Sequence, residues 1–140
     1  MSFSAARTEI VAQAELAKVA WTGPPSPLLL SYQNQGLIDP GSQFDPYLCV
    51  DIYFLNGEQL SLGKTKAMAD YGQIHLVAHA RENGGMLVCQ QILDHFRPYF
   101  ELKTLATVRT QASRGASEYS KSGWVCYPLV VPFWVNRLVT

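Results

Sequence analysis

Residues 47–55 read Tyr-Leu-Cys-Val-Asp-Ile-Tyr-Phe-Leu, and this stretch predicts a β-strand. Its even-numbered side chains form one apolar face, namely Leu48, Val50, Ile52 and Phe54. Alternation of this kind is typical of a strand that packs one face on a core.

The residues that follow predict a hairpin. Asn56-Gly57 is a turn signal, and residues 63–66, Gly-Lys-Thr-Lys, are expected at an exposed tip. Residues 69–80 alternate again, with Ile74, Leu76 and Ala78 on one face. We therefore expect an antiparallel pair of strands joined by a long loop.

Two amphipathic helices are expected on either side of this hairpin. Apolar residues recur every three or four positions over 3–21, and Gly23-Pro24-Pro25 must end that helix. Asn83-Gly84-Gly85 opens a second helix. Pro98 is expected to end it, because the residue before a proline avoids the α region.

The rest of the chain predicts further strands and loops. Residues 22–46 are expected to form a flexible loop that contains a short strand at 28–32. Residues 101–111 predict a fourth strand, 112–122 a polar connection, and 124–135 a last apolar strand.

The last strand contains two prolines, Pro128 and Pro132, which have the same parity. Both remove an N–H donor on the same side of the strand, so an edge or a bulge is expected there. An apolar strand with a weakened edge needs a cover. The candidates are a neighbouring subunit, the N-terminal helix and the long loop.

These elements predict a single α+β domain over residues 1–140, in which one mixed, mostly antiparallel sheet of about five strands packs against two helices. Apolar residues make up 48% of the chain, which excludes a disordered polypeptide. There is no apolar run of about 18 residues and no signal-peptide pattern, so we expect a cytoplasmic protein without a membrane span.

Charge is balanced overall but divided along the chain. Residues 1–96 hold five basic and nine acidic side chains, and residues 97–140 hold six basic and two acidic ones. Zero net charge argues against a general nucleic-acid binder. An acidic and a basic part can join copies head to tail, and such a contact can close into a ring. Uneven scatter by chance is the alternative.

No motif predicts catalysis, a cofactor or a metal. His75 and His79 have a spacing that suits a metal only on a helix, and Leu76 stands where zinc proteases need Glu. Residues 63–65 resemble the end of a P-loop, but Glu58 replaces its first glycine. The Gly-x-Ser-x-Gly elbow of hydrolases is absent from the sequence.

Three cysteines and one aspartate stand in apolar stretches. Cys49, Cys89 and Cys126 form no CxxC pair and are expected to be buried thiols. Asp51 is expected to face water or a basic partner, because an unpaired buried carboxylate is costly.

Four basic residues are expected at loop tips, namely Lys64, Lys66, Arg114 and Lys121. We interpret them as candidate assembly contacts with an acidic neighbour. Ordinary solvated loop charge is the alternative interpretation.

Several short motifs occur in a characteristic order: Ala-Trp-Thr-Gly-Pro at 20–24, Tyr-Gly-Gln-Ile-His-Leu-Val at 71–77, Gly-Gly at 84–85, Ile-Leu-Asp-His-Phe at 92–96, and Gly-Trp-Val-Cys-Tyr-Pro-Leu-Val-Val-Pro-Phe at 123–133. Their order and spacing resemble the phage tail terminator family, related in role to the minor tail protein that caps lambda-like tails.

The resemblance implies a mixed sheet with packed helices, and subunits in a ring, commonly a hexamer. The ring would end tail-tube polymerisation at the head-proximal end and offer a surface to the head–tail connector. The implied partners are copies of the chain, the tail tube protein and the connector. The implied location is the virion tail of a phage or prophage, assembled in the host cytoplasm. A head–tail joining protein is the alternative, followed by a small ligand-binding domain or enzyme.

Overall fold

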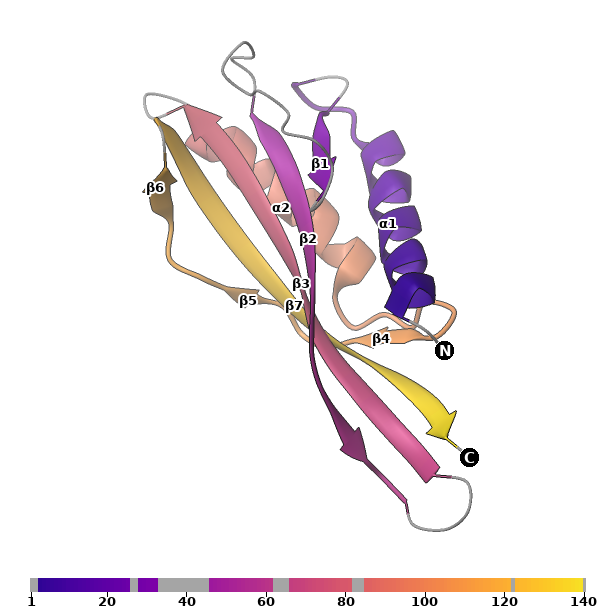
Figure 1. The fold of residues 1–140 in the computed structure, drawn as a ribbon. Helices are drawn as coiled ribbons and strands as arrows, with labels where there is room; N and C mark the ends of the chain where they lie inside the picture. Colours follow the sequence, from indigo (N-terminus) through magenta and orange to yellow (C-terminus); the bar gives the residue numbers. More distant parts are fainter. Residues whose placement is uncertain are drawn as a thin grey trace.

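The structure, a computed structural model, describes residues 3–25, 28–32, 46–61, 66–81, 85–121 and 123–139. The fold is α+β, with one twisted, mostly antiparallel sheet and two helices on one of its faces (Figure 1). The described strands number seven rather than about five, in the order β1-β2-β3-β7-β4, with β5 and β6 also paired to β7. Only β1 pairs in parallel.

The helices are α1 (Phe3–Ala20) and α2 (Met86–Phe100). The strands are β1 (Leu30–Tyr32), β2 (Tyr47–Gln59), β3 (Lys66–Arg81), β4 (Val108–Thr110), β5 (Arg114–Gly115), β6 (Tyr119–Lys121) and β7 (Trp124–Val139). The predicted tip residues 63–65 and most of the predicted loop lie outside the described residues. Neither described helix is long and apolar enough to cross a membrane.

The helix predicted over 3–21 is confirmed by α1. Its buried stripe consists of Ala6, Ile10, Ala14 and Ala17. Three of these four side chains are alanines, which allow α1 to lie close to α2, and His95 of α2 joins the two helices. The His95 Nε2 atom lies 2.8 Å from the Ala17 carbonyl oxygen, and its ring meets Trp21 edge-on. The Ile-x-x-His-Phe motif is thus a helix-packing motif in this chain.

The C-terminal end of α2 corrects the prediction at Pro98. The helix continues through Pro98 to Phe100, whose side chain is fully buried. Only the final turn follows the proline, so the loss of one N–H is small compared with the burial of an aromatic ring. The Gln13 side chain of α1 donates a hydrogen bond of 2.7 Å to the Tyr99 carbonyl, which holds this turn.

Strand β2 is longer than predicted, because Asn56-Gly57 does not turn the chain. The pairing with β3 shifts register between Phe54 and Gly57 and then continues to Gln59, which defines a β-bulge. A bulge adds twist and keeps the strand in the sheet. A Cβ atom at Gly57 would stand 2.7 Å from the Asp70 Oδ1 atom, so this position favours glycine for space rather than for a turn.

The strand predicted over 101–111 is reduced to Val108–Thr110. Just before it, α1 holds the chain in a turn through the Glu9 carboxylate. This carboxylate accepts hydrogen bonds from the backbone N–H groups of Thr107 at 2.5 Å and Val108 at 3.2 Å, and from the Thr107 hydroxyl. A contact between residues so far apart in the chain leaves no periodic signal in the sequence.

The polar connection predicted over 112–122 contains two short strands, β5 and β6, which pair with β7. The prediction missed them because Arg114, Tyr119 and Ser120 are exposed and show no apolar alternation. Pro132 and Pro128 fall in the two gaps between β4, β5 and β6. The prediction of a damaged ladder on one side of β7 is confirmed, but the segment that covers it is 108–121 and none of the three predicted candidates.

Two carboxylates make this fold sensitive to acid. Burial alone raises the pKa of Glu9, but hydrogen bonds from Thr107 and Val108 outweigh it and hold the pKa below its usual value of 4.5. Hydrogen bonds from the Ser113 side chain and backbone likewise lower the pKa of Glu101. A carboxylate whose pKa is lowered by folding stabilises the fold above its unfolded pKa.

We therefore expect the free energy of unfolding to decrease as pH falls below about 4.5 and through the lower folded pKa values. Urea denaturation at a series of pH values measures this. Glu9→Gln should cost a few tenths to about 1 kcal/mol at neutral pH, because the group is partly exposed, and should flatten the acid slope. A slope unchanged in Glu9→Gln would contradict this role of Glu9.

Candidate assembly surface

One face of the sheet carries neither a helix nor a second sheet among the described residues (Figure 1). The register places alternate side chains of β2, β3 and β7 on it. We call this surface the uncovered face. Its members are Tyr47, Cys49, Asp51 and Tyr53 of β2, Gln73, His75, Val77, His79 and Arg81 of β3, and Trp124, Cys126, Pro128 and Val130 of β7.

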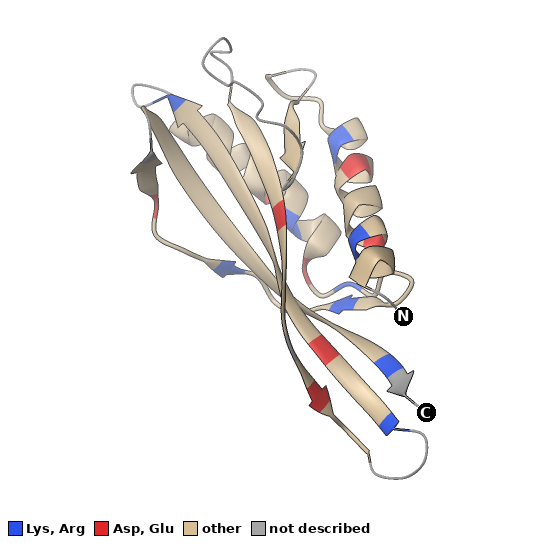
Figure 2. Cartoon of the chain, viewed as in Figure 1, with Lys and Arg blue, Asp and Glu red and all other residues tan. Residues whose placement is uncertain are grey.

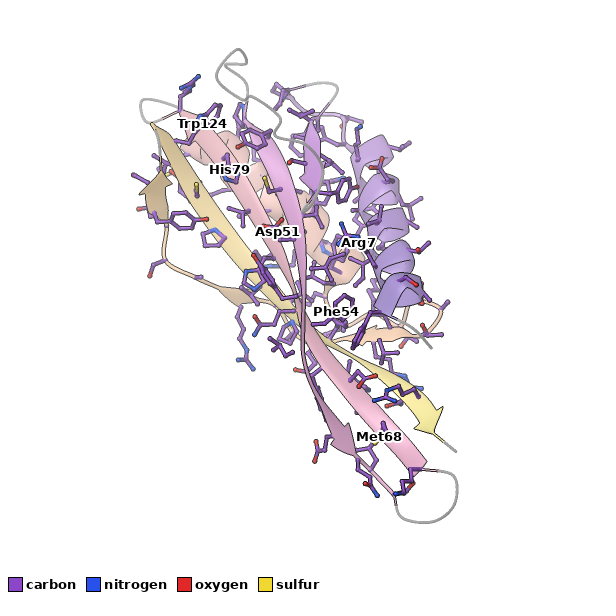
Figure 3. All side chains as sticks on the ribbon, in the orientation of Figure 1. Arg7, Asp51, Phe54, Met68, His79 and Trp124 are labelled. Atoms are coloured by element: carbon purple, nitrogen blue, oxygen red, sulfur yellow. The ribbon has the colours of Figure 1, made fainter. Side chains whose placement is uncertain are left out.

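Aromatic rings form a row on the uncovered face. The Tyr53 ring meets His75 edge-on, with centroids 4.6 Å apart. Further along, Tyr47 stacks on His79 at 4.6 Å and meets Trp124 edge-on at 5.2 Å. Figure 3 labels His79 and Trp124 at this end of the sheet. Tyr47 and Trp124 are buried, at 8% and 5% exposed, whereas Tyr53 is 40% exposed, so the Tyr53 end of the row is the part open to a partner. Exposed rings with polar rims are typical of surfaces that bind other proteins.

Asp51 lies within this row, opposite His75 in the register. Burial raises the pKa of the Asp51 carboxyl above its usual 3.8, and the nearby charges of His75, His79 and Arg7 offset this only in part. Burial also lowers the pKa of His75, against the opposing effect of Asp51. Asp51 is half-buried on the uncovered face, and its predicted contact with water or a basic partner stays a prediction.

The two histidines are not arranged to share a metal ion. Positions four apart on a strand are separated by about 13 Å, and both residues lie on β3. The His75 Nε2 atom lies 3.0 Å from Gln73 Oε1, and the His79 Nδ1 atom 3.0 Å from the Val77 carbonyl oxygen. In the described ranges, no group of three or more His, Cys, Asp or Glu side chains could hold a metal ion.

The cysteines agree with the prediction at two of three positions. Cys89 and Cys126 are buried free thiols, and burial raises the pKa of Cys89 to about 12. Cys49 of β2 is only half-buried, although Cys126, on the same face of the sheet, is fully buried.

Beyond the helices, β2, β3 and β7 continue as a three-stranded arm (Figure 1). We define the arm as residues 55–60, 66–71 and 134–139. Strand β3, with sixteen residues, spans about 50 Å, whereas α1, with 18 residues, spans about 27 Å. The helix layer ends where Phe3 of α1 contacts Phe54 at 4.5 Å between centroids.

The arm is held together by polar contacts and exposes apolar side chains. The Arg137 Nε atom donates to Asp70 Oδ2 at 2.5 Å, and the Tyr71 hydroxyl donates to Glu58 Oε2 at 3.0 Å. Leu55 is 58% exposed and Leu60 is 53% exposed. A monomer gains little from leucines in this position, so the arm is a candidate contact surface.

Both outer edges of the arm are open among the described strands. Strand β1 pairs with β2 only at Leu48–Val50, and β4 pairs with β7 only as far as Val135. The outer sides of Leu55–Gln59 and Asn136–Val139 pair with no described strand. Open edges of this kind can pair with another chain.

The four predicted contact residues do not form one patch. Lys64 lies outside the described residues. Lys66 opens β3 at the tip of the arm, whereas Lys121 ends β6 at the opposite end of the sheet. Arg114 is exposed in β5, midway along the edge.

The two edges of the sheet differ in charge: acidic side chains lie on the β1–β2 edge, and mostly basic side chains lie on the opposite edge (Figure 2). The described β1–β2 edge, 28–32 and 46–61, has the acids Asp51 and Glu58 and no Lys or Arg. The opposite edge, 108–121 and 124–139, carries the bases Arg109, Arg114, Lys121 and Arg137 and a single acid, Glu118. Sequence reasoning missed Glu58 and Arg109, and only the strand order could have revealed them.

Comparisons with known proteins show the fold alone. No family model matches the chain, and no curated protein matches it. Among solved structures 19 chains match. One of them has a TM-score of 0.64 and 14% sequence identity, and the alignment covers 96% of this chain and 96% of that one. At this sequence identity the match shows a shared fold and no function.

Proposed function

We propose that this chain is a structural assembly protein of a phage tail, a tail terminator that caps the head-proximal end of the tail tube as a ring of its own copies. The observation that carries the proposal is the arm, with its open edges and exposed leucines. Such an extension adds little to the stability of a single copy and suits contacts with neighbouring chains.

The sequence motifs direct the proposal to the terminator family. Residues 71–77 contribute the centre of β3, 92–96 the contact of α2 with α1, and 123–133 the strand β7. In this role the chain would contact its own copies, the tail tube protein and the head–tail connector. A hexameric ring in the virion tail, formed in the host cytoplasm, is the expected assembly.

Deletion of the gene from its phage tests this function. We expect overlong tails or headless particles under the electron microscope, together with loss of infectivity, because nothing then ends tube growth. Expression of the intact chain in the host should restore normal particles. Tails of normal length without heads would favour the head–tail joining role, and normal infectious particles would refute both.

A further inference from the structure

A row of four side chains crosses the sheet from one edge to the other. Asp51 lies opposite His75, His75 opposite Val130, and Val130 opposite Arg114. Residues opposite one another in a sheet lie on the same face, so all four belong to the uncovered face. We define the level of a residue as its position along β3, read through the strand register. Asp51 and Arg114, an acid and a base, therefore stand at the same level on opposite edges.

A second acid and a second base stand at nearly equal levels further toward the arm. Glu58 lies opposite Ala69 of β3. Arg109 lies opposite Trp134 of β7, which in turn lies opposite Tyr71. The two levels differ by two positions on β3, about 7 Å, which two long side chains can bridge. Glu58 and Arg109 are both exposed.

The strand directions allow these levels to meet between copies. Both β2 and β7 are antiparallel to β3, so they run in the same direction. A neighbour related by rotation, with no shift along the strands, places its β7 edge beside the β2 edge with the levels preserved. The open edges Glu58–Gln59 and Asn136–Arg137 are also level, through Ala69 and Met68 of β3, and could add backbone hydrogen bonds where β4 ends.

We propose that copies of this chain join head to tail through the two edges of the sheet, so that Asp51 of one copy meets Arg114 of the next and Glu58 meets Arg109. The occupant of each edge is a second copy, because the described β1–β2 edge carries acids and no Lys or Arg, whereas bases outnumber acids on the opposite edge. A symmetric dimer would set Glu58 against Glu58, or Arg109 against Arg109, and would be repulsive. The inference rests on the proposed function only in that both require self-association.

Charge reversal on the full chain tests this arrangement. Glu58→Arg and Arg109→Glu each create a like-charge contact, and we expect each to weaken self-association roughly tenfold in sedimentation velocity at low salt. Mixing the two variants pairs Arg with Glu at one contact and Glu with Arg at the next. Association should therefore return in the mixture, and also in the double variant alone. Added salt should weaken every attractive case.

Glu118→Arg is the matched control, because it makes the same charge change on the basic edge. It should leave association unchanged, because Glu118 takes part in neither proposed contact, provided that circular dichroism shows all variants folded. A wild-type chain that stays monomeric at every concentration would overturn the proposal. So would an effect of Glu118→Arg equal to that of Glu58→Arg, or a mixture that stays as weak as its components.

The two proposals can fail separately. If deletion gives abnormal tails and the reversed charges leave association intact, the tail function stands and the edge contact falls. If the charge-reversal variants behave as expected but the deletion phage forms normal particles, the edge contact is supported and the tail function is refuted.

Discussion

Replacement of Gly72 by alanine is expected to lower the free energy of unfolding by about 2–3 kcal/mol. Gly72 lies in β3 on the core face, where the helix layer ends and the arm begins. The rings of Phe54 and Phe133 close over it from the two flanking strands, with centroids 5.8 Å apart. A Cβ atom there would stand 2.3 Å from Phe133 Cζ and 2.5 Å from the Tyr53 carbonyl oxygen.

The second of these contacts decides the size of the effect. The Phe133 ring could rotate away, but the Tyr53 oxygen belongs to the backbone of β2, so the sheet itself must shift. Urea denaturation measures the loss. Gly115→Ala is the matched control, because a Cβ at that glycine meets nothing within 4 Å. Equal stability of the two variants would show that the strands yield at Gly72.

This geometry gives a physical reason for the aromatic-Gly motif at 71–77. The sequence shows a glycine between Tyr71 and Gln73, but not which ring occupies the space above it. That ring comes from Phe133, which is distant in the chain. Motifs of this kind can be recognised by their order, whereas their cause requires the strand pairing.

Elements whose apolar residues recur regularly over many positions were predicted well, because each of them packs on the core through that apolar stripe. Helix α1 and strand β3 show this, with buried residues at the expected positions. Local stop signals were less reliable, since tertiary packing overrode them. Burial of Phe100 carries α2 past Pro98, and a bulge carries β2 past Asn56-Gly57.

The candidate surface was only partly predictable for the same reason. The division of charge was visible in the composition of the two halves of the chain. Its location on two edges depends on β2 and β7 flanking β3, which no local pattern states. The predicted strand ended at residue 55, whereas β2 continues to Gln59. The prediction therefore left Glu58 outside the sheet and did not include the arm.

Asp51→Asn is expected to act in opposite directions on the isolated chain and on its assembly. Burial raises the folded pKa of Asp51 above 3.8, so the folded state holds this proton more tightly than the unfolded state. The charged form therefore costs stability once pH rises through the folded pKa. Asparagine removes the charge, so the variant should be more stable at neutral pH and should lose this advantage below about pH 3.8.

Association should change the other way, because the variant no longer attracts Arg114 of the next copy. We expect roughly tenfold weaker self-association, and Arg114→Ala should have the same effect. In the Arg114→Ala background, Asp51→Asn should cause no further loss, since the partner charge is already absent. A chain that is less stable with asparagine would show that contacts within its own fold hold the carboxylate. An acid that weakens its own domain and strengthens a contact between copies is best explained by selection for assembly.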